Sequence, residues 1–141
     1  MAGFKTDYLS KKFLDWVFGK QSYTPPDTVY CALSTTTPLP DGTNFTEPAG
    51  ANYSRLAVAN NVTNFPGAAI EAAKETVHCA IAIVFPTTNG AWGTITWAGW
   101  FEAASGGNMI DAGPLTIPLV VNASNMQVSF PADTGFTGTE S

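Results

Sequence analysis

The feature that most constrains this chain is the density of turn-forming residues that begins at Pro25. The main turn signals are Pro25-Pro26, Pro38, Pro40, Asp41-Gly42, Pro48, Pro66-Gly67, Asn89-Gly90 and Gly106-Gly107. Proline ends helices, and the glycine-containing pairs favour tight turns. This spacing therefore excludes a helical bundle.

Between the turns lie short runs rich in β-branched and aromatic residues, which predict strands. These runs are Thr28–Ser34, Tyr53–Ala59, Thr76–Phe85, Thr94–Ala103, Met109–Leu115, Leu119–Val121 and Met126–Phe130. Short strands joined by turns indicate a mainly β fold, a single antiparallel β-sandwich or barrel of jelly-roll-like type. Strand alternation in the fourth run places Ile95, Trp97 and Phe101 together in the core. An alanine-rich patch at 68–73 is compatible with one helical turn.

One segment ahead of the turns has helical periodicity. Its apolar residues recur at steps of four, three and one, which places them on one side of a helix: Leu9, Phe13, Trp16 and Val17. Lys11 and Lys12 fall off that stripe. Thr6 or Asp7 can cap the first amides, and Gly19 can end the helix in a left-handed conformation. We predict a short N-terminal amphipathic helix at about 6–19, its stripe packed under its own β body or against a sister subunit.

The length of 141 residues fits one domain. We expect a single domain over 1–141, with the helix first, a β body at about 28–131 and a C-terminal tail at 132–141. Charged residues make up only 12%, about half the usual share. Because a sparsely charged surface resists self-association poorly, it favours oligomerisation or docking on partners.

The charge is unevenly distributed. Residues 1–20 carry four lysines and two aspartates, a net of +2, and the remainder carries two basic and nine acidic residues, a net of −7. These sum to the net charge of −5. We expect no nucleic-acid partner, because phosphate binding needs a larger basic patch. We also expect no membrane segment and synthesis in a cytoplasm, since neither a signal-peptide pattern nor a long apolar run is present.

The sequence offers little for catalysis. His78 is the single histidine, and strand alternation turns it away from its neighbour Cys79. Cys31 and Cys79 lie in apolar runs and are expected to be buried thiols. Three Cys and His residues are too few for structural zinc at the usual spacings. Glu102 and Asp111 could approach as a carboxylate pair, although such acids are usually solvated. We expect no enzyme, metal or cofactor.

Tryptophans provide an alternative to a purely structural role. Trp92, Trp97 and Trp100 fall within nine residues, and an exposed indole can stack on a sugar ring. Trp97 alternates with the apolar face. Trp92 adjoins a turn and Trp100 lies on the polar face, so these two are the candidates for an exposed or interface role.

Several short motifs are spread along roughly residues 7–130: Asp7-Tyr8-Leu9, Leu14-Asp15, Val17-Phe18-Gly19, Tyr23-Thr24-Pro25-Pro26, Tyr30 with Ala32-Leu33, Tyr53 with Arg55, Phe85-Pro86, Trp92-Gly93-Thr94-Ile95-Thr96, Gly99 with Phe101, Gly106-Gly107-Asn108 and Gly113-Pro114-Leu115. In their order and spacing they resemble a family of small tailed-bacteriophage proteins commonly labelled "phage tail fibre protein". The resemblance implies a virion component without enzymatic residues, made in a host bacterial cytoplasm. The compact size also resembles the cement proteins that decorate phage heads.

Of these roles we expect capsid decoration, in which a protein that binds only the assembled shell stabilises it. The expected partners are the major capsid protein or other virion proteins, together with further copies in a homo-oligomer, a trimer being favoured. The alternatives are a tail-fibre-associated or adaptor protein and a carbohydrate-binding host-attachment module. The expected interface residues are Leu9, Lys11, Lys12, Phe13, Trp16, Val17, Trp92 and Trp100.

Overall fold

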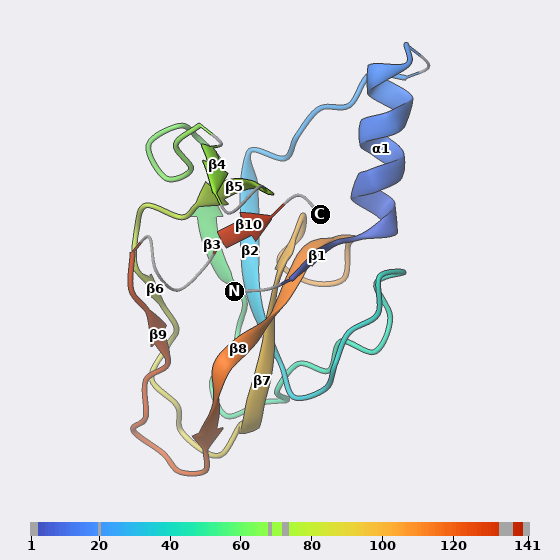
Figure 1. Ribbon diagram of the computed structural model, residues 1–141. Helices are drawn as coiled ribbons and strands as arrows, with labels where there is room; N and C mark the ends of the chain where they lie inside the picture. The colour runs from blue at the N-terminus through green and yellow to red at the C-terminus, as the bar shows by residue number, and fades with distance from the viewer. Residues whose placement is uncertain (1–2, 20, 68, 72–73, 133–136, 140–141) are drawn as a thin grey trace.

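The computed structural model describes residues 3–19, 21–67, 69–71, 74–132 and 137–139, with side chains over 3–19, 21–67 and 79–132. A five-stranded antiparallel sheet, in the order β1-β8-β7-β2-β3, forms its centre (Figure 1). Its strands are β1 (Phe4–Lys5), β8 (Met109–Val121), β7 (Gly93–Phe101), β2 (Thr28–Ser34) and β3 (Leu56–Ala59). Strand β2 has the bounds expected from the sequence.

Two smaller antiparallel sheets and one helix complete the described fold. Strands β10 (Thr137–Thr139), β5 (Lys74–His78) and β4 (Ala69–Glu71) form one sheet, and β6 (Ile83–Val84) pairs with β9 (Ser129–Phe130). The helix is α1 (Asp7–Val17). The expected class, mainly β and antiparallel with a short N-terminal helix, is confirmed.

Several strand boundaries differ from expectation. The alanine-rich patch at 68–73, which is compatible with a helical turn, does not form one where it is described, because 69–71 form β4. The expected C-terminal tail at 132–141 contains β10, and positions 133–136 and 140–141 lie outside the described residues. The run expected as one strand over Thr76–Phe85 divides between β5 and β6, which belong to different sheets.

Two strands expected around Pro118 are the single strand β8. β8 pairs with β7 along one edge, but on its other edge with β1 only at Asp111 and Ala112. Prolines are tolerated at a strand edge that has no neighbour, because the missing N–H then breaks no ladder bond. Pro114 and Pro118 can therefore lie within a continuous strand.

Side chains cover both faces of the central sheet. On one face, Leu33 of β2 packs in a core with Ile83 of β6 and Phe130 of β9, so the small sheet covers this side. On the other face, Phe101 forms a second core whose cover includes Phe45 from the loop after β2. The two ring centroids lie 5.0 Å apart in an edge-to-face arrangement.

The expectation that Ile95, Trp97 and Phe101 share one face is wrong. A register shift between Ile95 and Trp97 interrupts the pairing of β7 with β8. Between these two pairs β7 advances by two residues and β8 by five, so the regular pairing that alternation assumes is broken at this point. Ile95 consequently lies in the first core with Ala98 and Trp100, whereas Trp97 and Phe101 lie in the second.

Close backbone approach explains one glycine in β7. A Cβ added at Gly99 would lie 2.9 Å from Cε2 of Phe45 and 3.2 Å from the carbonyl oxygen of Asp111. A side chain here would displace Phe45 from the second core. The close packing of Phe45 and β8 therefore requires a glycine at position 99.

Both cysteines are buried free thiols in the first core, as expected. Burial raises the pKa of the Cys31 thiol well above its ordinary value. The thiol form therefore persists throughout the neutral range.

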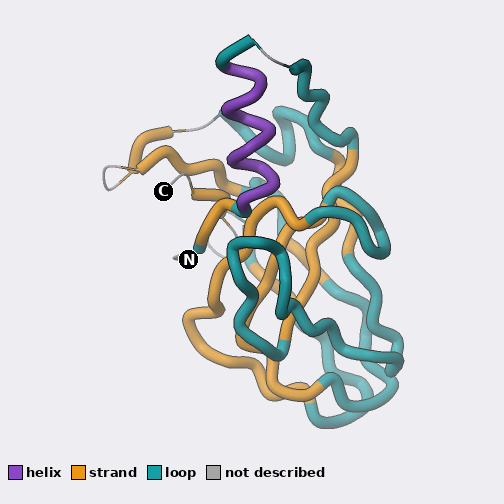
Figure 2. The backbone as a smooth tube through the Cα atoms, turned by 90° about the vertical axis from the view of Figure 1, so that its right-hand side faces the viewer, coloured by secondary structure: helices purple, strands orange, loops and turns teal. Residues whose placement is uncertain are grey.

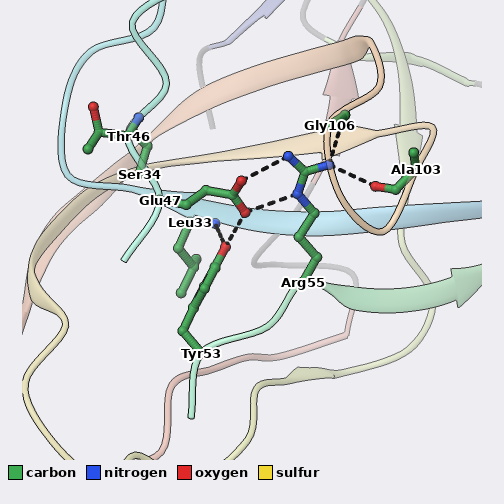
Figure 3. Close-up of polar contacts among 8 residues, drawn as sticks. All are labelled: Leu33, Ser34, Thr46, Glu47, Tyr53, Arg55, Ala103 and Gly106. Atoms are coloured by element: carbon green, nitrogen blue, oxygen red, sulfur yellow. Dashed lines mark hydrogen bonds and ion pairs between the residues drawn. The ribbon is translucent and has the colours of Figure 1, made fainter. Parts of the chain in front are cut away.

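A network centred on Arg55 joins three parts of the β body (Figure 3). Its guanidinium donates to both carboxylate oxygens of Glu47, from Nε at 3.0 Å and from Nη2 at 2.8 Å. Nη1 donates to the carbonyl oxygens of Ala103 at 2.7 Å and Gly106 at 2.8 Å. The same group stacks 3.8 Å from the ring centre of Phe101. The Arg55 side chain is only 7% exposed, so this pair is largely removed from water.

Tyr53 extends the network into the central sheet. Its hydroxyl donates to Glu47 Oε1 at 2.8 Å and accepts from the backbone N–H of Leu33 at 3.0 Å. Burial raises the pKa of Tyr53, which keeps the donor protonated. The loop after β2, the start of β3 and the turn between β7 and β8 are thus held by one set of bonds.

We predict that Glu47→Gln destabilises the fold by about 3 kcal/mol, because it leaves a nearly buried guanidinium without its counter-charge. Asp41→Asn is the matched control. It removes a carboxylate from the same loop while keeping an oxygen that can accept from Thr43, and its effect should stay within about 0.5 kcal/mol. Urea unfolding of both variants measures the difference, and equal midpoints would contradict the prediction.

Candidate functional site

The helix α1 stands at one end of the β body. Figures 1 and 2 show it extending beyond the sheets in two perpendicular views, with its N-terminal end at the body and its C-terminal end outermost. It begins after β1, and residues 21–27 lead from its outer end back to β2. The helix ends at Val17, and Gly19 has a φ of +71°, the left-handed conformation expected there.

Thr6 fixes the base of the helix. It is 1% exposed, and its hydroxyl donates to the carbonyl oxygens of Met109 at 2.6 Å and Ile110 at 3.0 Å. The same oxygen accepts from the N–H of Leu9 at 3.3 Å, which caps the helix. In addition, the N–H of Asp7 donates to the carbonyl oxygen of Pro40 at 2.9 Å. Thr6 therefore joins the first turn of α1 to β8.

Tyr8 makes a second connection. Its hydroxyl donates to Glu102 Oε2 at 2.9 Å, and the side chain of Asn108 donates to the other oxygen of that carboxylate. The pKa of Tyr8 is raised to about 12, mainly by partial burial and then by the hydrogen bond to Glu102. Because Glu102 and Asn108 belong to the turn that Arg55 holds, the helix is anchored on the fixed part of the body.

The side of α1 nearest the body is polar. Tyr8, Lys12 and Asp15 follow one another at helical spacing and are half-buried. Lys12 lies over the ring of Tyr8, with 5.7 Å between Nζ and the ring centre. Lys11 forms an ion pair with Asp15.

The apolar stripe of α1 is largely exposed, although Nζ of Lys5 in β1 lies 5.7 Å from the ring centre of Phe13. The large apolar side chains of the outer part of the helix, and the residue that follows it, are between 47% and 70% exposed: Phe13, Leu14, Trp16, Val17 and Phe18. Leu9, near the base, is half-buried. The expectation that this stripe packs under its own β body is therefore wrong, because Tyr8 and its polar neighbours occupy that position. Such a concentration of exposed apolar residues is typical of an interaction surface.

The other two expected interface residues are elsewhere. Trp92 is 4% exposed and donates from Nε1 to the carbonyl oxygen of Ala51 at 2.9 Å, and Trp100 is 6% exposed and packs against Phe65. The expected exposure of these two rings is wrong. Trp100 reaches the core because of the register shift in β7, and neither ring is available to stack on a sugar.

In the described residues no group of three or more histidine, cysteine or acidic residues could hold a metal ion. The side chain of His78 lies outside the described residues. Glu102 is engaged by Tyr8 and Asn108, which gives it a structural role. No helix in the described ranges has the length and apolar character needed to span a membrane.

Comparison with known proteins supplies the functional class. The model of a family described as podophage GP4 fiber I protein gp80 matches residues 5–135. No curated protein matches the chain. The expected role in capsid decoration is wrong, because the matched family is one of fibre proteins. The match supports the tail-fibre alternative.

We predict that Thr6→Val loosens the base of α1. Valine fills a similar volume but neither caps the helix nor donates to β8, so stability should fall by about 2 kcal/mol. Amide exchange at Leu9 should accelerate as well. Thr94→Val, at an exposed position in β7, should change stability by less than about 0.5 kcal/mol. Unchanged exchange at Leu9 would argue against the cap.

Alkaline titration tests the connection made by Tyr8. Its folded pKa of about 12 exceeds the ordinary value of 10.0, so the fold favours the protonated hydroxyl. The resulting stabilisation is fully present below pH 10 and is lost as the pH rises towards 12. Tyrosinate absorbance should show a step near pH 12 that Tyr8→Phe removes. A Tyr8 step near pH 10 would contradict the bond to Glu102.

Proposed function

This chain belongs to the podophage GP4 fiber I protein gp80 family, and we propose that it is a tail-fibre subunit attached to its neighbours through α1. As a member of a fibre family it is a non-enzymatic structural component of the virion. Its partners are other virion proteins.

The single observation that carries this proposal is the orientation of α1. The helix presents its polar side to its own body and its apolar stripe to solvent, while Thr6 and Tyr8 hold its base. When a partner covers apolar surface that is exposed on a firmly anchored element, that surface is removed from water and the complex is stabilised. Phe13, Trp16 and Val17 form the centre of the contact, and Leu9, Lys11 and Lys12 lie around it.

The β body supplies the rigid part of the subunit. Its central sheet is covered on both faces, and the bonds of Arg55 hold the turn that supports the helix. A load applied at α1 would therefore pass into the β7–β8 turn and the sheet. We further propose a homo-oligomeric fibre subunit, since only 12% of the residues are charged and such a surface resists self-association poorly. Three copies are the number we favour.

We predict that phage carrying Trp16→Glu assembles tails that lack this protein. A carboxylate in the middle of the apolar face would have to be buried without a partner on assembly. Val62→Glu is the control, because Val62 is also apolar and exposed but lies in the loop after β3.

Mass spectrometry of purified tails measures the occupancy. Tails that keep a full complement of the Trp16→Glu chain would refute attachment through α1. Loss of both variants from the tail would also refute it, because the effect would not be specific to the helix.

A further inference from the structure

We propose that Asn89 is a site of spontaneous modification, at which the side-chain amide is converted to a mixture of aspartate and isoaspartate. The proposal goes beyond attachment through α1 and does not depend on it. Asn89-Gly90 is the only asparagine–glycine pair in the sequence, and it lies between β6 and β7. Figure 1 shows the start of β7, which follows this pair, at the end of the body away from α1.

The reaction uses the chain itself and water. The backbone nitrogen of Gly90 attacks Cγ of Asn89, so that a new C–N bond forms and a cyclic imide closes. The side-chain nitrogen leaves as ammonia, together with the proton that the Gly90 nitrogen gives up. Water then opens the imide at either of its two carbonyl groups. One opening leaves an aspartate, and the other leaves an isoaspartate, in which the backbone runs through Cβ and Cγ.

The side chain of Asn89 is available for this attack. It is exposed, and in the described part of the chain its amide makes no hydrogen bond. By contrast, the amides of Asn44, Asn52 and Asn108 each donate to a fixed oxygen. A glycine at the next position adds no side chain that hinders the attacking nitrogen, and it lets the backbone rotate.

The backbone at Asn89 is held by few contacts. Its N–H donates to the carbonyl oxygen of Ala51 over 3.3 Å, which is long for such a bond, and it pairs with Ser124 in an isolated β-bridge. Exposed turns of this kind open locally without unfolding of the whole domain. Each opening lets the Gly90 nitrogen approach Cγ of Asn89. The contacts therefore slow the reaction relative to the unfolded chain but do not prevent it.

The packing of the neighbouring turn explains why a glycine follows Asn89. A Cβ added at Gly90 would lie 3.2 Å from Cβ of Ala51, which is closer than an ordinary contact. A larger residue at this position would push the two turns apart. The fold thus maintains the reactive pair.

Modification changes both the charge and the packing at this end of the molecule. The segments 80–101 and 112–132, which contain the pair and the turn beside it, include no charged residue. A carboxylate at position 89 places the first charge among them. Isoaspartate also lengthens the backbone by one carbon, which displaces the N–H that bonds to Ala51. Because the same carbonyl oxygen accepts from Nε1 of Trp92 at 2.9 Å, we expect Trp92 to become more exposed.

Peptide mapping by mass spectrometry tests the proposal on the purified chain after ageing in a mildly alkaline buffer. The peptide that contains Asn89 should gain the mass difference between an amide and an acid, and isoaspartate-specific methylation should label it. Asn125 is the control, because it is exposed and its N–H bonds to the carbonyl oxygen of Thr88, but Met126 follows it. The converted fraction at Asn89 should be higher by roughly tenfold or more, since glycine leaves the nitrogen unhindered.

Asn89→Gln tests the consequence for Trp92. The glutamine keeps an exposed amide, but the larger ring that it would have to form closes far more slowly, so this variant should stay unmodified. Tryptophan emission of the wild-type chain should move to longer wavelength as Asn89 converts, while that of Asn89→Gln should not change.

Three outcomes would overturn parts of the proposal. If Asn89 stays intact in the folded chain while the same chain converts in urea, Asn89 is not a modification site of the native protein. Equal conversion of Asn89 and Asn125 would refute the role of Gly90. Conversion of Asn89 without a change in tryptophan emission would refute the effect on Trp92.

Discussion

The bidentate pair between Arg55 and Glu47 is the interaction on which the arrangement of this subunit depends. Four N–H groups of one guanidinium reach a loop carboxylate and the carbonyl oxygens of Ala103 and Gly106. Because the β7–β8 turn is held in this way, Glu102 has a fixed place from which to accept the hydroxyl of Tyr8. The direction of α1 thus follows from an ion pair formed on the body, while its apolar face remains free for a neighbour.

Local rules account for those parts of the fold whose partners are close in sequence. Thr28–Ser34 lies between turn signals and is rich in β-branched and apolar residues, and it forms β2 with the expected bounds. The cap at Thr6 and the stop at Gly19 follow from side-chain oxygen chemistry and from the left-handed conformation that glycine accepts. The division of α1 into apolar and polar sides is likewise a property of its own sequence.

The remaining features depend on contacts across the chain. The register shift after Ile95 arises in the pairing with β8, so alternation along β7 alone assigns Trp97 and Trp100 to the wrong faces. No periodicity links Arg55 to carbonyl groups 48 and 51 residues away. Whether the stripe of α1 faces inwards is decided by the bond from Tyr8 to Glu102. Composition also could not separate a head protein from a fibre protein, since both expose surface that neighbours cover.

Burial of the two thiols affects how the subunit responds to oxidation after assembly. A virion is assembled in a reducing cell and then persists in an oxidising medium, where accessible thiolates form mixed disulfides or sulfenic acids. Cys31 is fully enclosed and its raised pKa keeps it protonated, and Cys79 is almost as deeply enclosed. Neither sulfur presents a nucleophile to dissolved oxidants. Both thiols can therefore pass from one redox environment to the other without being oxidised.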